Sequence, residues 1–244
     1  MNRMFMILLK NFWHVPGVLA RLNRRIHSPE KYTELEKIEP IQYLCKKVLV
    51  SGQISLEISG QEHIPAEGGF IFYPNHQGVF DAVAIGFAVN RLVSPVVKIE
   101  LMKYPLVREL FCCADALPMD RKDIRQSMRV LQEVQQRVKV GKVCLIFPEG
   151  TRSRKGNQLL EFKAGSFKPA LKTQCPIVPV ALVDSFKPFD TRATGPVTVH
   201  LHILKPLLWE EYQNMTTAEI AETVKQRIRF EMDEILSEKF TGCT

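Results

Sequence analysis

The chain has 244 residues, of which 45% are apolar and 24% are charged, and its net charge is +7. These proportions are typical of a globular protein of one large or two small domains, and they exclude a disordered, fibrous or low-complexity chain. No apolar run approaches the roughly 18 uninterrupted residues that a spanning helix needs, so we expect no bilayer crossing.

Most of the excess positive charge lies at the N-terminus. Residues 1–29 hold five basic residues and no acid, which gives +5, whereas the remaining 28 basic and 26 acidic residues give only +2. A nucleic-acid binder more often carries its cations as a stripe across the folded body. The distribution therefore favours an anionic membrane surface as a partner and argues against nucleic acid.

The first 50 residues predict an amphipathic helical segment that binds a membrane. Apolar side chains follow one helical face from Phe5 through Trp13 to Leu19, and cations lie beside that face at Arg3, Lys10 and residues 21–25. Aromatic and basic residues together suit a membrane interface. The alternative is a first helix that packs on the core and turns its basic face to water.

Beyond this segment, helical and strand patterns alternate. Helices are expected over residues 41–50, 82–89 and 124–138, and after the capping box formed by Thr216 and Glu219. Strands are expected over residues 53–59, 70–73, 95–99, 116–119, 143–147, 177–183 and, near an edge of the sheet, 197–203. The alternation predicts an α/β fold with a mixed, largely parallel sheet flanked by helices. We expect the helical segment over residues 1–50 and one α/β domain over residues 51–244.

His76 and Asp81 are the first candidates for chemistry. They follow an apolar strand, and open α/β sheets bind ligands at the carboxyl ends of their strands. An aspartate in the first turn of the next helix is placed to accept a hydrogen bond from one imidazole nitrogen, which leaves the other nitrogen as a base suited to neutral pH. The alternative is a histidine at a helix start and an aspartate that only complements the helix dipole.

A second group follows another buried strand and comprises Glu149, Gly150, Thr151 and Arg152. An arginine fork binds phosphate oxygens, and a glycine lets backbone N–H groups approach a ligand closely. Arg121 ends a third strand and is expected at the same sheet edge. A base beside these cations suits proton abstraction from a hydroxyl of a phosphorylated molecule, while a solvated loop with a Glu149–Arg152 pair is the alternative.

Other chemistries find less support. The chain lacks a G-x-S-x-G elbow, a Walker A loop and a dinucleotide glycine fingerprint, which argues against a serine hydrolase and a nucleotide enzyme. His200 and His202 share a strand face without an evident third ligand, so we interpret them as edge-strand surface and expect no metal. The cysteines show no C-x-x-C pair and predict reduced, mostly buried thiols in a cytosolic protein: Cys45, Cys112, Cys113, Cys144, Cys175 and Cys243.

Taken together, the two groups resemble the glycerolipid acyltransferase family. Residues 75–81 are similar to its N-H-x4-D block, and residues 147–153 match its F-P-E-G-T-R-S block in full. Within the family, the chain resembles the bacterial 1-acyl-sn-glycerol-3-phosphate acyltransferases, which convert lysophosphatidic acid to phosphatidic acid. The similarity covers about residues 55–185 and includes residues 98–101 with Pro105, 118–121, 162–165 and 178–180.

The resemblance implies a role for each matching residue. His76 is the expected general base on the glycerol sn-2 hydroxyl, Asp81 is its orienting partner, and the freed oxygen attacks the acyl thioester without an acyl-enzyme. Lys98 is the expected stabiliser of the developing oxyanion. The glycerol phosphate is expected at Arg121, Glu149, Gly150, Thr151 and Arg152.

The resemblance also implies the partners and the location. The donor is expected to be a thioester of acyl-carrier protein or coenzyme A, with no cofactor and no metal. The expected location is the cytoplasmic face of the cell membrane, as a peripheral or monotopic protein.

Two residues depart from the family's pattern. Gly78 stands where many relatives carry serine, and Asp115 stands where a glycine often precedes the Pro-x-Asp-Arg segment. An acid that pointed toward a phosphate site would repel the phosphate, so Asp115 leaves the acceptor open. The alternatives are an acyltransferase for glycerol 3-phosphate or another lysolipid, and a membrane-binding module without turnover.

Overall fold

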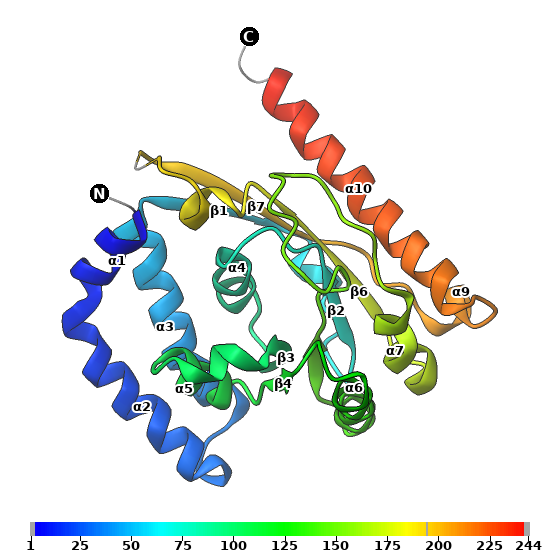
Figure 1. Cartoon of the computed structure of the whole chain (residues 1–244), viewed down its shortest axis with the longest axis horizontal. Coiled ribbons are helices and arrows are strands. Elements are labelled where there is room, and N and C mark those ends of the chain that lie inside the picture. Colours follow the sequence, from blue (N-terminus) through cyan, green and yellow to red (C-terminus); the bar gives the residue numbers. More distant parts are fainter. Residues whose placement is uncertain (1–2, 194, 242–244) are drawn as a thin grey trace.

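A computed structural model describes residues 3–193 and 195–241 of the chain. Its strands are β1 (Ile54–Ser59), β2 (Ile71–Pro74), β3 (Val93–Lys98), β4 (Leu117–Met119), β5 (Val143–Leu145), β6 (Ile177–Val183) and β7 (Val197–Ile203). Within the described residues they form one sheet of seven strands in the order β1-β7-β6-β2-β5-β3-β4 (Figure 1).

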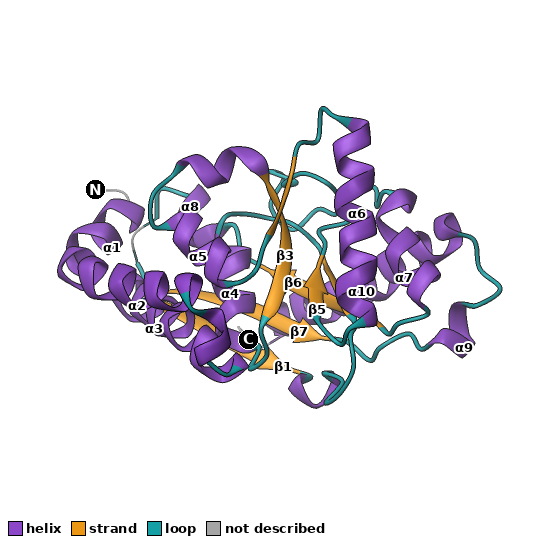
Figure 2. Cartoon of the chain, turned by 90° about the horizontal axis from the view of Figure 1, so that it is seen from below, coloured by secondary structure: helices purple, strands orange, loops and turns teal. Residues whose placement is uncertain are grey.

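Helices cover both faces of this sheet (Figure 2). The α-helices are α1 (Arg3–Asn11), α2 (Val15–His27), α3 (Glu34–Gly52), α4 (Phe80–Ala88), α5 (Val107–Cys113), α6 (Ile124–Lys139), α7 (Lys168–Thr173), α8 (Lys187–Asp190), α9 (Trp209–Tyr212) and α10 (Thr217–Thr241). Short 3-10 turns lie at Phe12–His14, Pro29–Lys31, Gln61–His63, Ile99–Lys103 and Ala164–Phe167.

The core has two layers because side chains alternate across the sheet. Ile71 and Tyr73 of β2 point to one face and pack with α6, α7 and α10. Phe70 and Phe72 point to the other face and pack with α4 and with Ile7 of α1. Strands such as β6 are buried along their whole length, which explains their uninterrupted apolar sequences.

The strand directions define the edge of the sheet at which the candidate residues lie. β6, β2, β5, β3 and β4 run parallel to one another, whereas β7 is antiparallel to β6 and parallel to β1. The predicted mixed, largely parallel sheet is therefore confirmed. The carboxyl ends of β6, β2, β5, β3 and β4 meet at the same edge, and the loops that follow them hold the candidate residues.

The helix expected over residues 41–50 begins earlier than predicted, at Glu34. A capping box starts it, because Thr33 and Glu36 satisfy each other's backbone N–H groups. Pro40 lies inside the helix and has no N–H for the Glu36 carbonyl. The guanidinium of Arg25 donates to that carbonyl at 2.5 Å and replaces the missing bond. The short helix α5 was not predicted at all.

The N-terminal helices pack on the rest of the chain through a few buried side chains. Ile7, Val18 and Leu22 are at most 5% exposed. The opposite side of α1 and the turn after it exposes large apolar side chains: Phe5, Leu8, Leu9, Phe12 and Trp13. No helix in the described part of the chain combines the length and the apolar character that a membrane span requires.

The basic residues of this segment are less available than their number suggests. Arg3, which was predicted as a surface cation, is 1% exposed and donates to the backbone carbonyls of Lys187, Pro188 and Gly195. Arg21 and Arg25 form ion pairs with Glu39. Most of the terminal charge is thus used within the fold.

The cysteines in the described residues are free thiols, as predicted. Cys45, Cys113, Cys144 and Cys175 are buried, and burial raises the pKa of Cys45 to about 12. A thiol with such a pKa is unreactive at neutral pH. Cys112 is exposed, and Cys243 lies outside the described residues.

Truncation of a buried leucine tests whether α2 belongs to the folded body. We expect Leu22→Ala, at a fully buried position, to lower the free energy of unfolding by about 2–5 kcal/mol. Leu9→Ala is the matched control, because Leu9 is 61% exposed, and its effect should stay within about 0.5 kcal/mol. Denaturant unfolding measures both values. Equal effects of the two substitutions would show that α2 does not pack as described.

Candidate active site

The sheet brings the predicted site residues to one edge. His76 follows β2, Lys98 ends β3, Arg121 follows β4 and Glu149 follows β5. The strand order puts β2 between β6 and β5, so the loops after these strands are direct neighbours. This edge is where an open α/β sheet binds its ligands.

His76 and Asp81 form the predicted pair. The ring Nδ1 of His76 lies 2.7 Å from Oδ2 of Asp81. Asp81 is fully buried in the first turn of α4, whereas the side chain of His76 keeps 16% exposure. Because an ionised carboxylate only accepts hydrogen bonds, Nδ1 carries the proton and Nε2 is left as the basic nitrogen.

The carboxylate of Asp81 also binds the surrounding backbone. Oδ2 accepts hydrogen bonds from the N–H groups of Gln77 at 2.8 Å and Gly78 at 3.1 Å. Oδ1 accepts one from the hydroxyl of Ser185, at 2.5 Å. These donors take the place of the water that a fully buried carboxylate lacks. Asp81 therefore fixes the loop as well as the imidazole.

The second sequence group holds His76 from the other side. The ring of Phe147 stacks on the His76 ring with centroids 3.9 Å apart. The N–H of Ser153 donates to the His76 carbonyl at 2.8 Å. The two groups are more than 60 residues apart in sequence, yet both touch the same histidine.

Glu149 stabilises the position of His76 through hydrogen bonds to the backbone. Its side chain is 3% exposed, and its two carboxylate oxygens accept from the N–H groups of His76 at 2.8 Å and Leu160 at 3.3 Å. Burial raises the pKa of Glu149 to about 7, although both hydrogen bonds oppose the shift. The Glu149–Arg152 pair considered from the sequence is not formed, because the carboxylate points inward.

Gly150 makes room for a lysine. Its φ of +68° lies in the left-handed region, and a Cβ at this position would lie 2.8 Å from Nζ of Lys163. Thr151 is exposed beside it. Arg152 is partly exposed and makes a loose ion pair with Asp190, at 3.8 Å. The turn thus presents the Thr151 hydroxyl and the cations of Arg152 and Lys163 next to Glu149.

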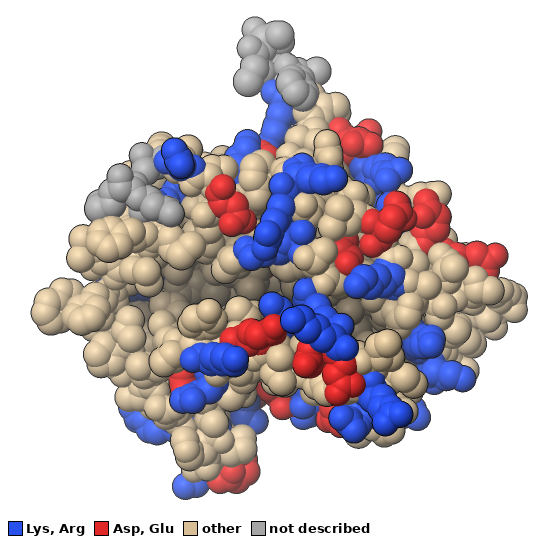
Figure 3. Space-filling view, viewed as in Figure 1, with Lys and Arg blue, Asp and Glu red and all other residues tan. Residues whose placement is uncertain are grey.

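Lys98 and Arg121 lie farther along the same edge. Lys98 pairs in register with Met119, two residues before Arg121. Its ammonium forms an ion pair with Glu100 at 3.0 Å. Burial lowers the pKa of Arg121 below its usual value, although the nearby Glu100 carboxylate opposes this shift. Figure 3 shows a hollow over α4 that is bordered by Lys and Arg side chains.

The two departures from the family's pattern have structural explanations. A Cβ at Gly78 would lie 2.6 Å from Oδ2 of Asp190, so a larger residue requires that carboxylate to move. Asp115 precedes β4, at the sheet edge opposite the site. Its carboxylate forms ion pairs with Arg137 at 3.1 Å and Lys142 at 2.8 Å. Asp115 is therefore neutralised and does not face the candidate site.

Sequence reasoning missed Ser185, which touches Asp81. It also missed Gln77 and Asn157, whose side chains hydrogen bond to each other at 2.9 Å beneath the site. Gln77 lies inside the recognised block and Ser185 follows β6. A polar residue just after a buried strand is the signal that would have identified Ser185, because β6 ends at the same edge.

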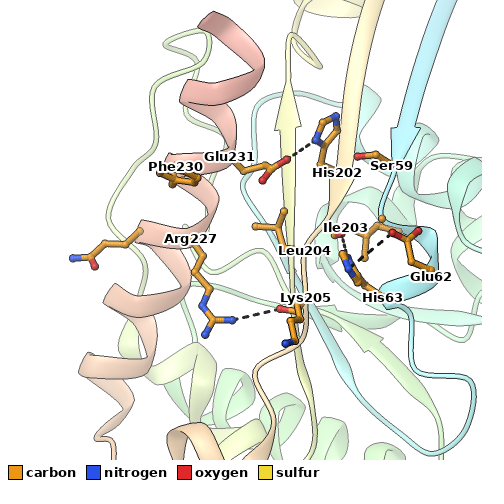
Figure 4. A pocket seen from close by; sticks show the side chains of 12 residues that line it. Ser59, Glu62, His63, His202, Ile203, Leu204, Lys205, Arg227, Phe230 and Glu231 are labelled. Carbon is orange, nitrogen blue, oxygen red and sulfur yellow. Dashed lines mark hydrogen bonds and ion pairs between the residues drawn. The ribbon is translucent and has the colours of Figure 1, made fainter. Parts of the chain in front are cut away.

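The two histidines of β7 belong to another region. β7 lies between β1 and β6 rather than at the edge of the sheet, and His200 is buried. The interpretation of these two histidines as edge-strand surface was therefore wrong. Their Nδ1 atoms contact Glu57 at 3.1 Å and Glu231 at 2.6 Å. His202 is one of the residues that line a groove of about 590 Å³ (Figure 4). Within the described residues, no cluster of three or more His, Cys, Asp or Glu side chains is arranged to bind a metal.

Comparison with known proteins agrees with the family resemblance of the two sequence groups around His76 and Glu149. A family model described as Acyltransferase matches residues 55–183, which is more than half of the chain. A mouse 1-acyl-sn-glycerol-3-phosphate acyltransferase alpha is 26% identical over 193 residues, covering 78% of this chain and 67% of the relative. A probable 1-acyl-sn-glycerol-3-phosphate acyltransferase of Mycoplasma pneumoniae is 28% identical over 200 residues, covering 77% and 74%.

The fold also matches a solved structure. The crystal structure of the 1-acyl-sn-glycerophosphate acyltransferase from Thermotoga maritima superposes with a TM-score of 0.76 at 24% identity, covering 93% of this chain and 91% of that one. Some relatives are longer than this chain. The match spans 57% of a Limnanthes douglasii 1-acyl-sn-glycerol-3-phosphate acyltransferase that is 30% identical over 162 residues.

The buried Glu149 should titrate near pH 7. In NMR of the ¹³C-glutamate-labelled protein, one carboxyl should have a midpoint near 7 and should disappear in Glu149→Gln. The raised pKa means that the folded state binds this proton more tightly than the unfolded chain. Its stabilising contribution is therefore complete below the usual value of 4.5 and is lost as the pH rises through about 7. Glutamate midpoints that all lie near 4.5 would contradict the buried placement.

Proposed function

We propose that this chain, which belongs to the acyltransferase family, transfers a fatty acyl group from a thioester to the sn-2 hydroxyl of 1-acyl-sn-glycerol-3-phosphate and yields phosphatidic acid. The names of the relatives from mouse and Mycoplasma pneumoniae support this acceptor. The observation that carries the proposal is the contact of 2.7 Å between His76 and Asp81 at the carboxyl end of β2.

His76 acts as the general base in this reaction. Asp81 holds the proton on Nδ1, so Nε2 takes the proton of the sn-2 hydroxyl as its oxygen attacks the thioester carbonyl. The tetrahedral intermediate then collapses, the C–S bond breaks, and the proton on Nε2 passes to the leaving thiolate. The products are an ester and a free thiol, and no acyl-enzyme forms.

The cations at the sheet edge orient the acceptor and stabilise charge. We assign the glycerol phosphate to Arg121 and Arg152 together with the Gly150–Thr151 turn, because guanidinium groups and free backbone N–H groups bind phosphate. Lys98 is assigned to the oxyanion that develops on the thioester carbonyl. Glu149 acts as a positioning residue, since its buried carboxylate binds the backbone of His76. The reaction as written uses no cofactor and no metal.

We propose that residues 1–50 bind the protein to a membrane. Exposed Phe12 and Trp13 follow the exposed apolar side of α1, and such side chains suit the interfacial region of a bilayer. Lys10 adds a cation at the same place. We propose a peripheral or monotopic protein on the cytoplasmic face, where reduced cysteines persist. The acyl donor is a thioester of acyl-carrier protein or coenzyme A.

Substitution of the base should abolish most of the turnover. We expect His76→Ala to lower phosphatidate formation by about 10²–10⁴-fold, the range that general-base catalysis contributes. The assay uses labelled lysophosphatidate in anionic vesicles, with acyl-coenzyme A and acylated acyl-carrier protein as donors in separate reactions. Circular dichroism confirms that the variant is folded.

His63→Gln is the control for this assay, because His63 lies at the opposite sheet edge and binds the Ile203 carbonyl. Its turnover should equal that of the unmodified protein. Undiminished turnover of His76→Ala would refute the mechanism. Acylation of glycerol 3-phosphate in place of lysophosphatidate would refute the acceptor.

Removal of the exposed aromatic pair should release the protein from membranes. We expect Phe12→Ser with Trp13→Ser to lower cosedimentation with anionic vesicles at least tenfold, because two large interfacial side chains are lost. Phe230→Ser is the control, since Phe230 is 67% exposed on α10, away from this segment. Unchanged binding of the double variant would contradict the role of residues 1–50.

A further inference from the structure

We propose, on the basis of the function proposed above, that Ser185 is a positioning residue for the His76–Asp81 pair. It follows β6, and a partly buried chain of hydrogen bonds connects it through Gln77, Asn157 and Asp184 to α10. Ser185 and Asp81 are both fully buried. The site would thus depend on a third residue that lies more than 100 positions from the other two.

The hydroxyl of Ser185 completes the coordination of a buried charge. Oδ2 of Asp81 binds the His76 ring and two backbone N–H groups, and Oδ1 accepts from Ser185 Oγ at 2.5 Å. A buried anion needs a donor at each oxygen, because water cannot replace a missing one. Ser185 thereby sets the rotation of the carboxylate, and the carboxylate sets the rotation of the imidazole.

This hydrogen bond also tunes the pair as an acid. A donor to a carboxylate favours its charged form. Loss of the Ser185 hydroxyl would remove the donor to Oδ1 of Asp81 and leave the charged carboxylate with the His76 ring and the N–H groups of Gln77 and Gly78 alone. The rate of a reaction that needs the unprotonated pair would then begin to fall at a higher pH on acidification.

Gln77 holds Ser185 against Asp81. The backbone N–H of Ser185 donates to Oε1 of Gln77 at 2.8 Å, and the backbone N–H of Gln77 donates to Asp81 at 2.8 Å. The amide of Gln77 then donates to Oδ1 of Asn157 at 2.9 Å. Gln77 is 2% exposed, and its bonds to Ser185 and Asp81 are buried.

Asp184 anchors the outer end of the network. Asn157 accepts from the Asp184 N–H at 2.8 Å and donates to the Asp184 carboxylate at 3.0 Å. The other carboxylate oxygen binds Lys239 of α10 at 2.6 Å and Lys187 at 2.9 Å. Burial raises the pKa of Asp184, but these donors outweigh burial and lower the pKa. Asp184 has a φ of +63°, a strained conformation that the anchoring bonds hold in place.

The test compares pH–rate profiles of the full-length protein and Ser185→Ala on anionic vesicles that contain lysophosphatidate. We expect kcat to fall about tenfold or more, the value of one hydrogen bond to a charged group, with KM changed by less than about twofold. We also expect the acidic limb of the profile to move to higher pH. A serine that only fills space would lower stability and leave that limb in place.

Two further variants make the result specific. Ser185→Thr keeps the hydroxyl, so the acidic limb should return to its position in the unmodified protein. Ser185→Cys keeps the size with a weaker donor, so the limb should lie between those of Ser185→Ala and the unmodified protein. Ser94→Ala is the matched control, because Ser94 is also buried, at 2% exposure, and lies in β3. Its profile should equal that of the unmodified protein.

A second readout does not require turnover. In ¹H NMR, the proton on Nδ1 of His76, assigned by its loss in His76→Ala, should shift in Ser185→Ala and remain in place in Ser94→Ala. Absence of acyl transfer by the unmodified protein would refute the proposed function alone. An unmoved acidic limb or an unshifted His76 resonance in folded Ser185→Ala or Ser185→Cys would overturn the role of Ser185.

Discussion

The carboxylate of Asp81 is the charge around which the candidate active site is organised. It binds the imidazole of His76, the backbone of the loop after β2, and Ser185 at the end of β6. A buried charge is tolerated only when hydrogen bonds replace its water, so each of these groups has a fixed place. Because Nδ1 of His76 is bound to Asp81, Nε2 is the ring nitrogen left for the role of base.

The strand order explains how residues from separate loops meet at the candidate active site. β2 lies between β5 and β6, so its loop meets Phe147 and Glu149 on one side and Ser185 on the other. Short apolar runs predicted β2, β3, β4, β5 and β6 to within a few residues, because interior strands are largely apolar. The alternation of apolar and polar residues predicted β1 and β7 equally well. The pairing of His76 with Asp81 was predictable for a related reason, since both partners lie within one local segment.

Contacts between distant segments were not predictable in this way. Glu149 was expected at the ligand, but the structure directs it to the backbone of His76, a partner set by the adjacency of β2 and β5. Arg3 was counted as a membrane cation, yet carbonyl groups near α8 bury it. Ser185 had no local signal apart from its place after β6. Each of these contacts joins segments that lie far apart in the sequence, and a local amino-acid pattern does not specify such contacts.

In the proposed reaction, Nε2 of His76 receives the proton of the acceptor's hydroxyl. A crystal structure of the protein with 1-acyl-sn-glycerol-3-phosphate and no acyl donor would show whether the acceptor binds in this way. We expect the sn-2 oxygen within about 3 Å of Nε2, and the phosphate beside Arg121 and Arg152. An acceptor bound with its sn-2 oxygen far from His76 would rule out His76 as the base.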